Sequence, residues 1–273
     1  KDQEISFPGW ESLEKEKLEQ KPAVYLVIKD MDGNAIRRIK APAKKGVHRV
    51  AWDLRYPHTD AIRSSKLPKK TDKSPKGMMA APGENTATLV KVIDGQATEL
   101  AAPQKFIVKR MKKGSLEGST PEATASFWRE LEDINLELSG TRVVLNENVE
   151  KVKMMSIALS RSQSAPGDLD KRLHEVNTHL QTMNKQLSGD PLRKGVGEKS
   201  LPTIGDRVSV AAMGTKTSTY GPTPTHRQSL QIAKSQLKTL RTELSEIANE
   251  LIPNMEQELL DAKAPYVKGA TMK

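Results

Sequence analysis

The stretch Asp30–Arg37, which reads Asp-Met-Asp-Gly-Asn-Ala-Ile-Arg, decides the fold of the first half of the chain. A β-prone run over 23–29 leads into the Asp-Gly pair, and a second run begins at Ala35. Two such runs joined by Asp-Gly are typical of a β-hairpin. A third strand is expected over 47–54, where it carries Trp52.

Working outward, the strand pattern continues as far as residue 110. Further strands are predicted over 35–40, 86–93 and 104–109, with Pro-Gly at 82–83 and Asp-Gly at 94–95 as turns. About 90 residues with five to seven short strands are typical of an immunoglobulin-like (Ig-like) β-sandwich. We place this domain at 22–110, after a charged lead-in over 1–21, with a long basic insertion over 55–80.

The periodicity changes after a linker at 111–118. Ser119-Thr120-Pro121-Glu122 is a strong helix start, because it offers a hydroxyl cap, a proline in the first turn and an acid at the positive end of the helix dipole. Seam residues then recur in steps of three and four, which is typical of packed helices. We predict helices to Leu159, over 169–187, around 203–213 and from Pro224 onward, with Pro253 kinking or ending the last one before a short helix over 254–264.

Three seams carry this prediction. Their members are Leu131, Ile134, Leu138, Thr141, Leu145, Asn148, Val152, Met155 and Leu159; then Leu169, Leu173, Val176, Leu180, Met183 and Leu187; then Leu230, Ala233, Leu237, Leu240, Leu244, Ile247 and Leu251. The expected fold class is therefore multidomain β plus α: the Ig-like sandwich followed by an antiparallel α-helical bundle over 119–265, with a tail over 266–273.

Length and composition bound the class of protein. The 273 residues suffice for two domains with separate cores. There is no cysteine, which excludes disulfides and thiolate metal sites. No run of 18 apolar residues occurs, so no transmembrane segment is predicted. The chain begins at Lys1 without a signal peptide, and we expect a processed chain or a piece of something longer.

The net charge of +10 belongs to the first half of the chain. Residues 1–113 hold 24 Lys and Arg against 14 Asp and Glu, whereas residues 114–273 hold 20 of each. Much of the excess lies in one run, formed by Arg63, Lys66, Lys69, Lys70, Lys73 and Lys76. Such a run is either a solvated loop or a contact for anionic glycans or lipid headgroups. It contains no aromatic residue, so nucleic acid is not the expected partner.

Two patterns come close to metal sites without meeting their requirements. His174 and His179 are five residues apart, and a zinc-protease helix needs its histidines four apart so that both rings share one face. Asp30 and Asp32 could open a calcium loop, but position twelve is Ala41 rather than glutamate. We therefore expect no metal and no cofactor.

Trp52 and Asp53 form the one pair with a catalytic interpretation. A ring beside a carboxylate would suit a glycan-acting hydrolase, but such enzymes need a second carboxylate nearby, and the sequence offers none. No serine lies in a nucleophile elbow and no glycine-rich loop introduces a helix. We expect Trp52 to be a core ring and the chain to lack catalytic residues, with a hydrolase fragment as the alternative.

The first long helix has a feature that favours a partner. Thr141 and Asn148 are polar residues within its seam, and Val143, Val144 and Val149 lie beside it. A widened apolar strip of this kind predicts a further packing surface. We expect this helix to dock against another protein part.

A family resemblance agrees with this organisation. Val27–Arg37, Gly46–Arg55 and Ala81–Gly83 resemble the Ig-like domain first described in flagellar hook-capping proteins. The helical half, with Leu131–Asn135 and Pro222–Thr225, resembles the tail that follows this domain in bacterial sortilin-like (BNR/VPS10-type) β-propeller exoproteins, which are often labelled glycosyl hydrolases. The resemblance covers roughly residues 20–265.

The resemblance implies an accessory role. It would make this chain the C-terminal region of a large exported bacterial protein, located outside the cell or on its surface. The β-propeller would lie upstream, and any hydrolase label would belong to it. The expected partner is that propeller or another subunit of the same assembly, and no family catalytic residue maps onto this chain.

Overall fold

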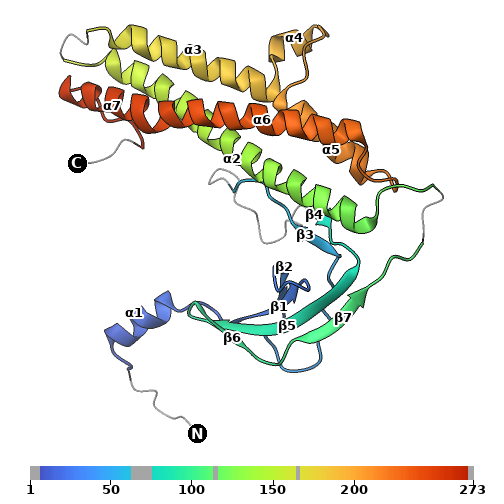
Figure 1. Cartoon of the computed structure of the whole chain (residues 1–273). Helices are drawn as coiled ribbons and strands as arrows, with labels where there is room; N and C mark the ends of the chain where they lie inside the picture. Colours follow the sequence, from blue (N-terminus) through green and yellow to red (C-terminus); the bar gives the residue numbers. More distant parts are fainter. Residues whose placement is uncertain (1–6, 63–75, 113–115, 164–166, 270–273) are drawn as a thin grey trace. The chain divides into compact units, whose positions relative to one another are not determined.

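The computed structural model describes residues 7–62, 76–112, 116–163 and 167–269. The chain divides into two compact units. The first, here called the β unit, consists of residues 1–57 and 75–113, and the second, the helical unit, consists of residues 58–74 and 114–273. The molecule thus combines antiparallel β-sheets with helices, as the coarse fold class predicted (Figure 1).

The predicted hairpin is present at the centre of the β unit. Strand β1 (Ala23–Lys29) pairs antiparallel with β2 (Ala35–Ala41), which confirms both predicted strands. The Asp30 carboxylate accepts the backbone N–H of Asp32 at 3.0 Å and of Asn34 at 2.8 Å. Gly33 adopts a φ of 82°, a conformation that side chains disfavour. Asp30 is therefore a turn residue.

The main sheet has five strands, in the order β2-β1-β5-β6, with β7 also paired to β5. Strand β5 (Gly83–Ile93) is long enough to pair with β7 (Gln104–Val108) along its first half and with β6 (Gln96–Glu99) along its second. The predicted strands over 86–93 and 104–109 are thus confirmed. Strand β6 was not predicted, because its four residues are all exposed and carry no apolar alternation.

The predicted strand over 47–54 is wrong. These residues form no strand, and the chain turns at Leu54, whose φ is 58°. Two side-chain bonds hold the turn: the Trp52 indole N–H donates to the Arg55 carbonyl at 3.0 Å, and the Asp53 carboxylate accepts the Arg55 N–H at 3.2 Å. A small second sheet is present instead, in which β3 (Arg55–Pro57) pairs with β4 (Lys76–Met79). Both strands lie inside the segment that was predicted as an insertion.

The core of the β unit lies on one face of the large sheet. Ile28 and Ile36 from the hairpin pack with Ala80, which follows β4. Partly buried hydrophobic residues complete this cluster: Leu26, Ile39, Trp52, Tyr56, Ala87 and Phe106. Trp52, Tyr56 and Ala80, which lie in or beside the β3–β4 sheet, therefore contribute a second layer over this face.

The helical unit begins with α2 (Pro121–Leu159), as predicted. The Thr120 hydroxyl accepts the Ala123 N–H at 3.2 Å, so the hydroxyl cap is real. α2 contacts α3 (Leu169–Ser188), α5 (Ile204–Lys216), α6 (Pro224–Glu246) and α7 (Ile252–Asp261). Figure 1 shows α2, α3 and the α6–α7 helix running side by side. The short helix α4 (Pro191–Gly195) also belongs to this unit, whereas the short helix α1 (Trp10–Leu18) belongs to the β unit.

The first two seams are confirmed in full, because every member is buried. The third is correct as far as Ile247, but Leu251 is 48% exposed and the seam prediction there is wrong. Residues Ile247–Leu251 form a π-helical segment, which adds a residue to the turn and moves the buried stripe to Ile252, Met255 and Leu259. The wide turn admits Pro253, which lacks the N–H that an α-helix would need there, so the helix continues.

Among the described residues, no helix combines the length and the apolar character needed to span a bilayer.

The burial of the α3 seam leads to a prediction about stability. Leu180 of α3 is fully buried, whereas Leu192 of α4 is 80% exposed. We expect Leu180→Ala to lower the free energy of unfolding by about 3 kcal/mol, because it removes packed methyl groups and leaves a cavity. Leu192→Ala should change it by less than about 0.5 kcal/mol. Denaturant unfolding of both variants is the measurement, and equal effects would contradict the assigned core.

Candidate functional site

Most of the basic run lies outside the described residues. This applies to Arg63, Lys66, Lys69, Lys70 and Lys73. Lys76, the last member, is exposed at the start of β4 and lies opposite Pro57 in the small sheet. The proposed anionic contact therefore remains a prediction.

The three valines of α2 have different surroundings. Val144 is 40% exposed, Val143 is half-buried, and Val149 is buried with 9% of its surface exposed. The polar seam residues are satisfied within their own helix: the Thr141 hydroxyl donates to the Glu137 carbonyl at 2.7 Å, and the Asn148 amide donates to the Val144 carbonyl at 2.8 Å. Val143 and Val144 are therefore the members of the predicted docking strip that a partner can reach.

The same face of α2 already holds an extended segment of the helical unit. The Ser139 hydroxyl accepts the backbone N–H of Ala61 at 3.1 Å and lies 3.3 Å from the carbonyl of Thr59, to which it can donate. Ser139 and Val143 are four residues apart, so they share a helix face. This contact was not predicted, since a lone serine on a helix gives no sequence signal.

Trp52 and Asp53 are engaged in the turn described above. The Trp52 ring is half-buried in the β-unit core, where its edge meets Phe106 with the ring centroids 6.2 Å apart. A sugar-stacking platform needs a ring face that is open to solvent, and a catalytic carboxylate needs a second one nearby. The observed contacts favour the structural role for this pair.

The two histidines of α3 do not act together. His174 is exposed, and His179 lies 3.3 Å from the Glu243 carboxylate of α6 through Nε2. Within the four described ranges, no group of three or more histidine, aspartate or glutamate side chains is arranged to hold a metal ion.

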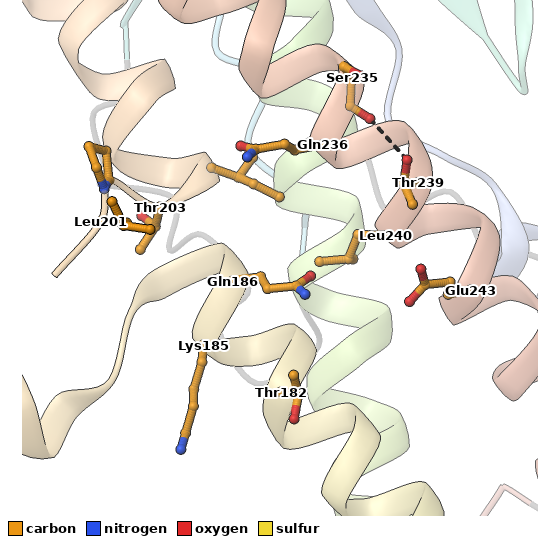
Figure 2. A pocket seen from close by; sticks show the side chains of 12 residues that line it. Thr182, Lys185, Gln186, Leu201, Thr203, Ser235, Gln236, Thr239, Leu240 and Glu243 are labelled. Atoms are coloured by element: carbon orange, nitrogen blue, oxygen red, sulfur yellow. Dashed lines mark hydrogen bonds between the residues drawn. The ribbon is translucent and has the colours of Figure 1, made fainter.

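A groove runs between α3 and α6 in the helical unit. It has a volume of about 550 Å³ and is closed on one side by the segment that precedes α5. Figure 2 shows the amide side chains of Gln186 from α3 and Gln236 from α6 projecting between the two helices, with Leu240 of α6 beside them. Neither amide has a hydrogen-bond partner among the described residues. The groove thus presents free amide donors and acceptors over an apolar floor.

The charged groups around this groove have structural partners. Lys185 extends away from the other labelled side chains and lies 3.1 Å from Asp190. The pKa of the Asp190 carboxyl is held below its ordinary value, first by the backbone N–H of Leu192 and then by Lys185. Glu243 is paired with His179. The groove is therefore suited to neutral hydrogen-bonding groups, such as the backbone of a peptide, rather than to a small ion.

Thr203, which lines one side of the α3–α6 groove, is held in place by a capping box. The Thr203 hydroxyl accepts the Asp206 N–H at 3.0 Å, while the Asp206 carboxylate accepts the Thr203 N–H at 3.0 Å. The pKa of Asp206 is lowered, chiefly by the Thr203 backbone N–H and next by its hydroxyl. The start of α5 is thereby satisfied internally and holds Ile204 against the groove.

Comparison of the chain with protein-family models, curated proteins and solved structures gave no match in any of the three.

The capping box gives a pH-dependent prediction. A carboxyl with a depressed pKa in the folded state stabilises the fold above its ordinary pKa of about 4, and this contribution is lost as the pH falls. We expect Asp206→Ala to cost about 1 kcal/mol at pH 7 and progressively less towards pH 3. Glu147→Ala on the exposed face of α2 is the control at pH 7. Thermal unfolding across this range is the measurement, and a pH-independent loss would contradict the cap.

The two roles of Trp52 are separable by experiment. Because the ring packs in the core, we expect Trp52→Ala to lower the free energy of unfolding of the β unit by about 3 kcal/mol. The matched control is Trp10→Ala, since Trp10 is 75% exposed. The purified chain should not turn over polysaccharides. Turnover that disappears in a folded Asp53→Asn variant would instead establish the hydrolase alternative.

Proposed function

We propose that this chain is a non-catalytic accessory and scaffolding portion of a large secreted or cell-surface bacterial protein. In this proposal the β unit is an Ig-like sandwich and the helical unit is an antiparallel bundle. The bundle docks to an upstream β-propeller or to another subunit of the same assembly. The resemblance to the C-terminal region of sortilin-like exoproteins motivates the proposal.

One observation carries the docking role. The outward face of α2 already binds an extended backbone, through the two contacts of Ser139 with Thr59 and Ala61. Exposed apolar side chains remain on other parts of α2, with Leu136 at 56%, Val144 at 40% and Ile157 at 55%. A helix that buries one face in its own unit and still presents apolar groups outward favours a second contact.

The candidate chemistry supports binding more than turnover. The pair that had a catalytic interpretation has a structural partner, because Trp52 and Asp53 both bind Arg55 in their turn. Of the residues considered as metal ligands, Asp30 holds the hairpin turn and His179 lies beside Glu243. The α3–α6 groove offers free amides, which recognise other polar groups but do not activate them.

The test uses Val144→Asp and Val143→Asp. A charge placed at a desolvated contact is costly, so we expect each to weaken the complex with the upstream portion at least tenfold. Val210→Asp on α5 is the matched control, because Val210 is 52% exposed and lies on another helix. Val149 is left unchanged, since a charge at that buried position would unfold the helix.

The measurement is co-purification of the upstream fragment with the chain from native material, with circular dichroism as the folding check. N-terminal sequencing and intact mass of the same material would define the two fragments. If both variants keep the complex intact while folded, α2 is not the docking helix.

A further inference from the structure

Strand β2 and the segment that follows it are basic throughout. Between Asp32 and Asp53 the sequence holds six Lys and Arg residues and no Asp or Glu. The six are Arg37, Arg38, Lys40, Lys44, Lys45 and Arg49. The last three are exposed and lie between β2 and β3, in a segment here called the Lys44–Arg49 loop. A concentration of one sign of charge on an exposed loop indicates an anionic partner.

Two local features set the shape of the Lys44–Arg49 loop. The His48 ring donates through Nε2 to the Lys44 carbonyl at 2.7 Å, which closes the loop on itself. Gly46 adopts a φ of 120°, a conformation that residues with side chains rarely adopt. Residues 45–47 therefore form the tip of a closed turn rather than an extended stretch.

An apolar side chain stands at this tip. Val47 has a relative exposure of 103%, so it is fully open to solvent. Lys44, Lys45 and Arg49 form no ion pair with any residue in the four described ranges. The loop thus presents one apolar group between cations that are not neutralised within the described chain.

The surface of a membrane that contains anionic lipids matches this combination. Its phosphate groups face water and attract Lys and Arg, and the acyl chains that begin below them accept an apolar side chain. A nucleic acid or an acidic glycan would engage the cations but leave Val47 in water. Proteins that bind single-stranded nucleic acid also use exposed aromatic rings, and residues 42–51 include none.

We propose that the Lys44–Arg49 loop is a contact site for anionic lipid headgroups, in which its three cations pair with phosphates and Val47 enters the interfacial layer beneath them. The contact is peripheral and reversible, since a few cations and one aliphatic group provide modest affinity. Binding falls as the salt concentration rises, because salt screens the attraction between exposed charges.

This inference goes beyond the proposed docking function and does not rest on it. Docking uses α2 of the helical unit and an upstream protein partner, whereas the lipid contact uses a loop of the β unit. The lipid contact is also separate from the anionic contact predicted for the basic run, which lies in another segment of the chain.

The test is co-sedimentation of the full chain with vesicles of phosphatidylcholine alone and with vesicles that also contain phosphatidylglycerol. We expect binding to the anionic vesicles only, and at least a tenfold loss of affinity between low ionic strength and about 0.5 M salt. Lys44→Gln with Lys45→Gln should weaken binding at least tenfold, since each cation near such a surface contributes about fivefold. The matched control, Lys109→Gln with Arg110→Gln, removes the same charge from an exposed pair after β7 and should bind like the parent.

Val47 distinguishes a lipid surface from other polyanions. Val47→Trp places at the tip a side chain that favours the membrane interface. We expect this variant to bind the anionic vesicles more tightly, with a blue shift of tryptophan emission that the parent chain does not show. Heparin and a DNA duplex should give no such shift. Circular dichroism of each variant is the folding check.

Three results would overturn the proposal. The first is a chain that does not bind anionic vesicles at low salt. The second is a folded Lys44→Gln, Lys45→Gln variant that binds like the parent, as it would if the basic run at 63–76 carried the contact. The third is a Val47→Trp variant whose affinity and emission are unchanged on the vesicles, or whose emission shifts equally with heparin, because the loop would then bind polyanions in general.

Discussion

The buried seam of α2 is the constraint on which the helical unit depends. This helix has 39 residues and is about 58 Å long, and α3, α5, α6 and α7 all contact it. A helix of this length cannot be held by propensity alone, and its stability comes from the apolar stripe that it buries. Leu131, Leu145 and Met155 along the stripe are at most 1% exposed. If this stripe slipped by one residue, the contacts of every other long helix would change.

Two polar residues inside this seam are compatible with its burial for a local reason. Thr141 and Asn148 each donate to a carbonyl four residues earlier in the same helix. A buried polar group costs free energy only when its hydrogen bonds are unmet, so neither residue needs a partner chain. The argument for docking on α2 therefore rests on its outward side, where Ser139 binds backbone and Val144 is open, and not on polarity within the seam.

The spacing of apolar residues along the sequence was sufficient to locate the long helices. It failed where the backbone departs locally from a regular helix or strand. The seam of α6 could be followed to Ile247, but the π-helical segment adds one residue before Pro253 and transfers burial from Leu251 to Ile252. Similarly, Trp52 lies in the core as expected, but not on a strand, because its indole N–H and the Asp53 carboxylate both bind Arg55 and turn the chain. The hairpin at Asp30 was predictable because Asp-Gly specifies a turn by itself. The free amides of Gln186 and Gln236 were not, since only the packing of α3 beside α6 brings them together.

The surfaces of the helical unit differ in the force that each would use, and this limits what each can bind. The outward face of α2 offers apolar groups and one hydroxyl, so binding there would tolerate salt and fail when a charge is introduced. The α3–α6 groove offers neutral amides, whose bonds to a partner replace bonds to water and therefore add little affinity by themselves but reject a mismatched partner. In the proposed docking, tight association would therefore come mainly from α2, while the α3–α6 groove would determine which partner is accepted.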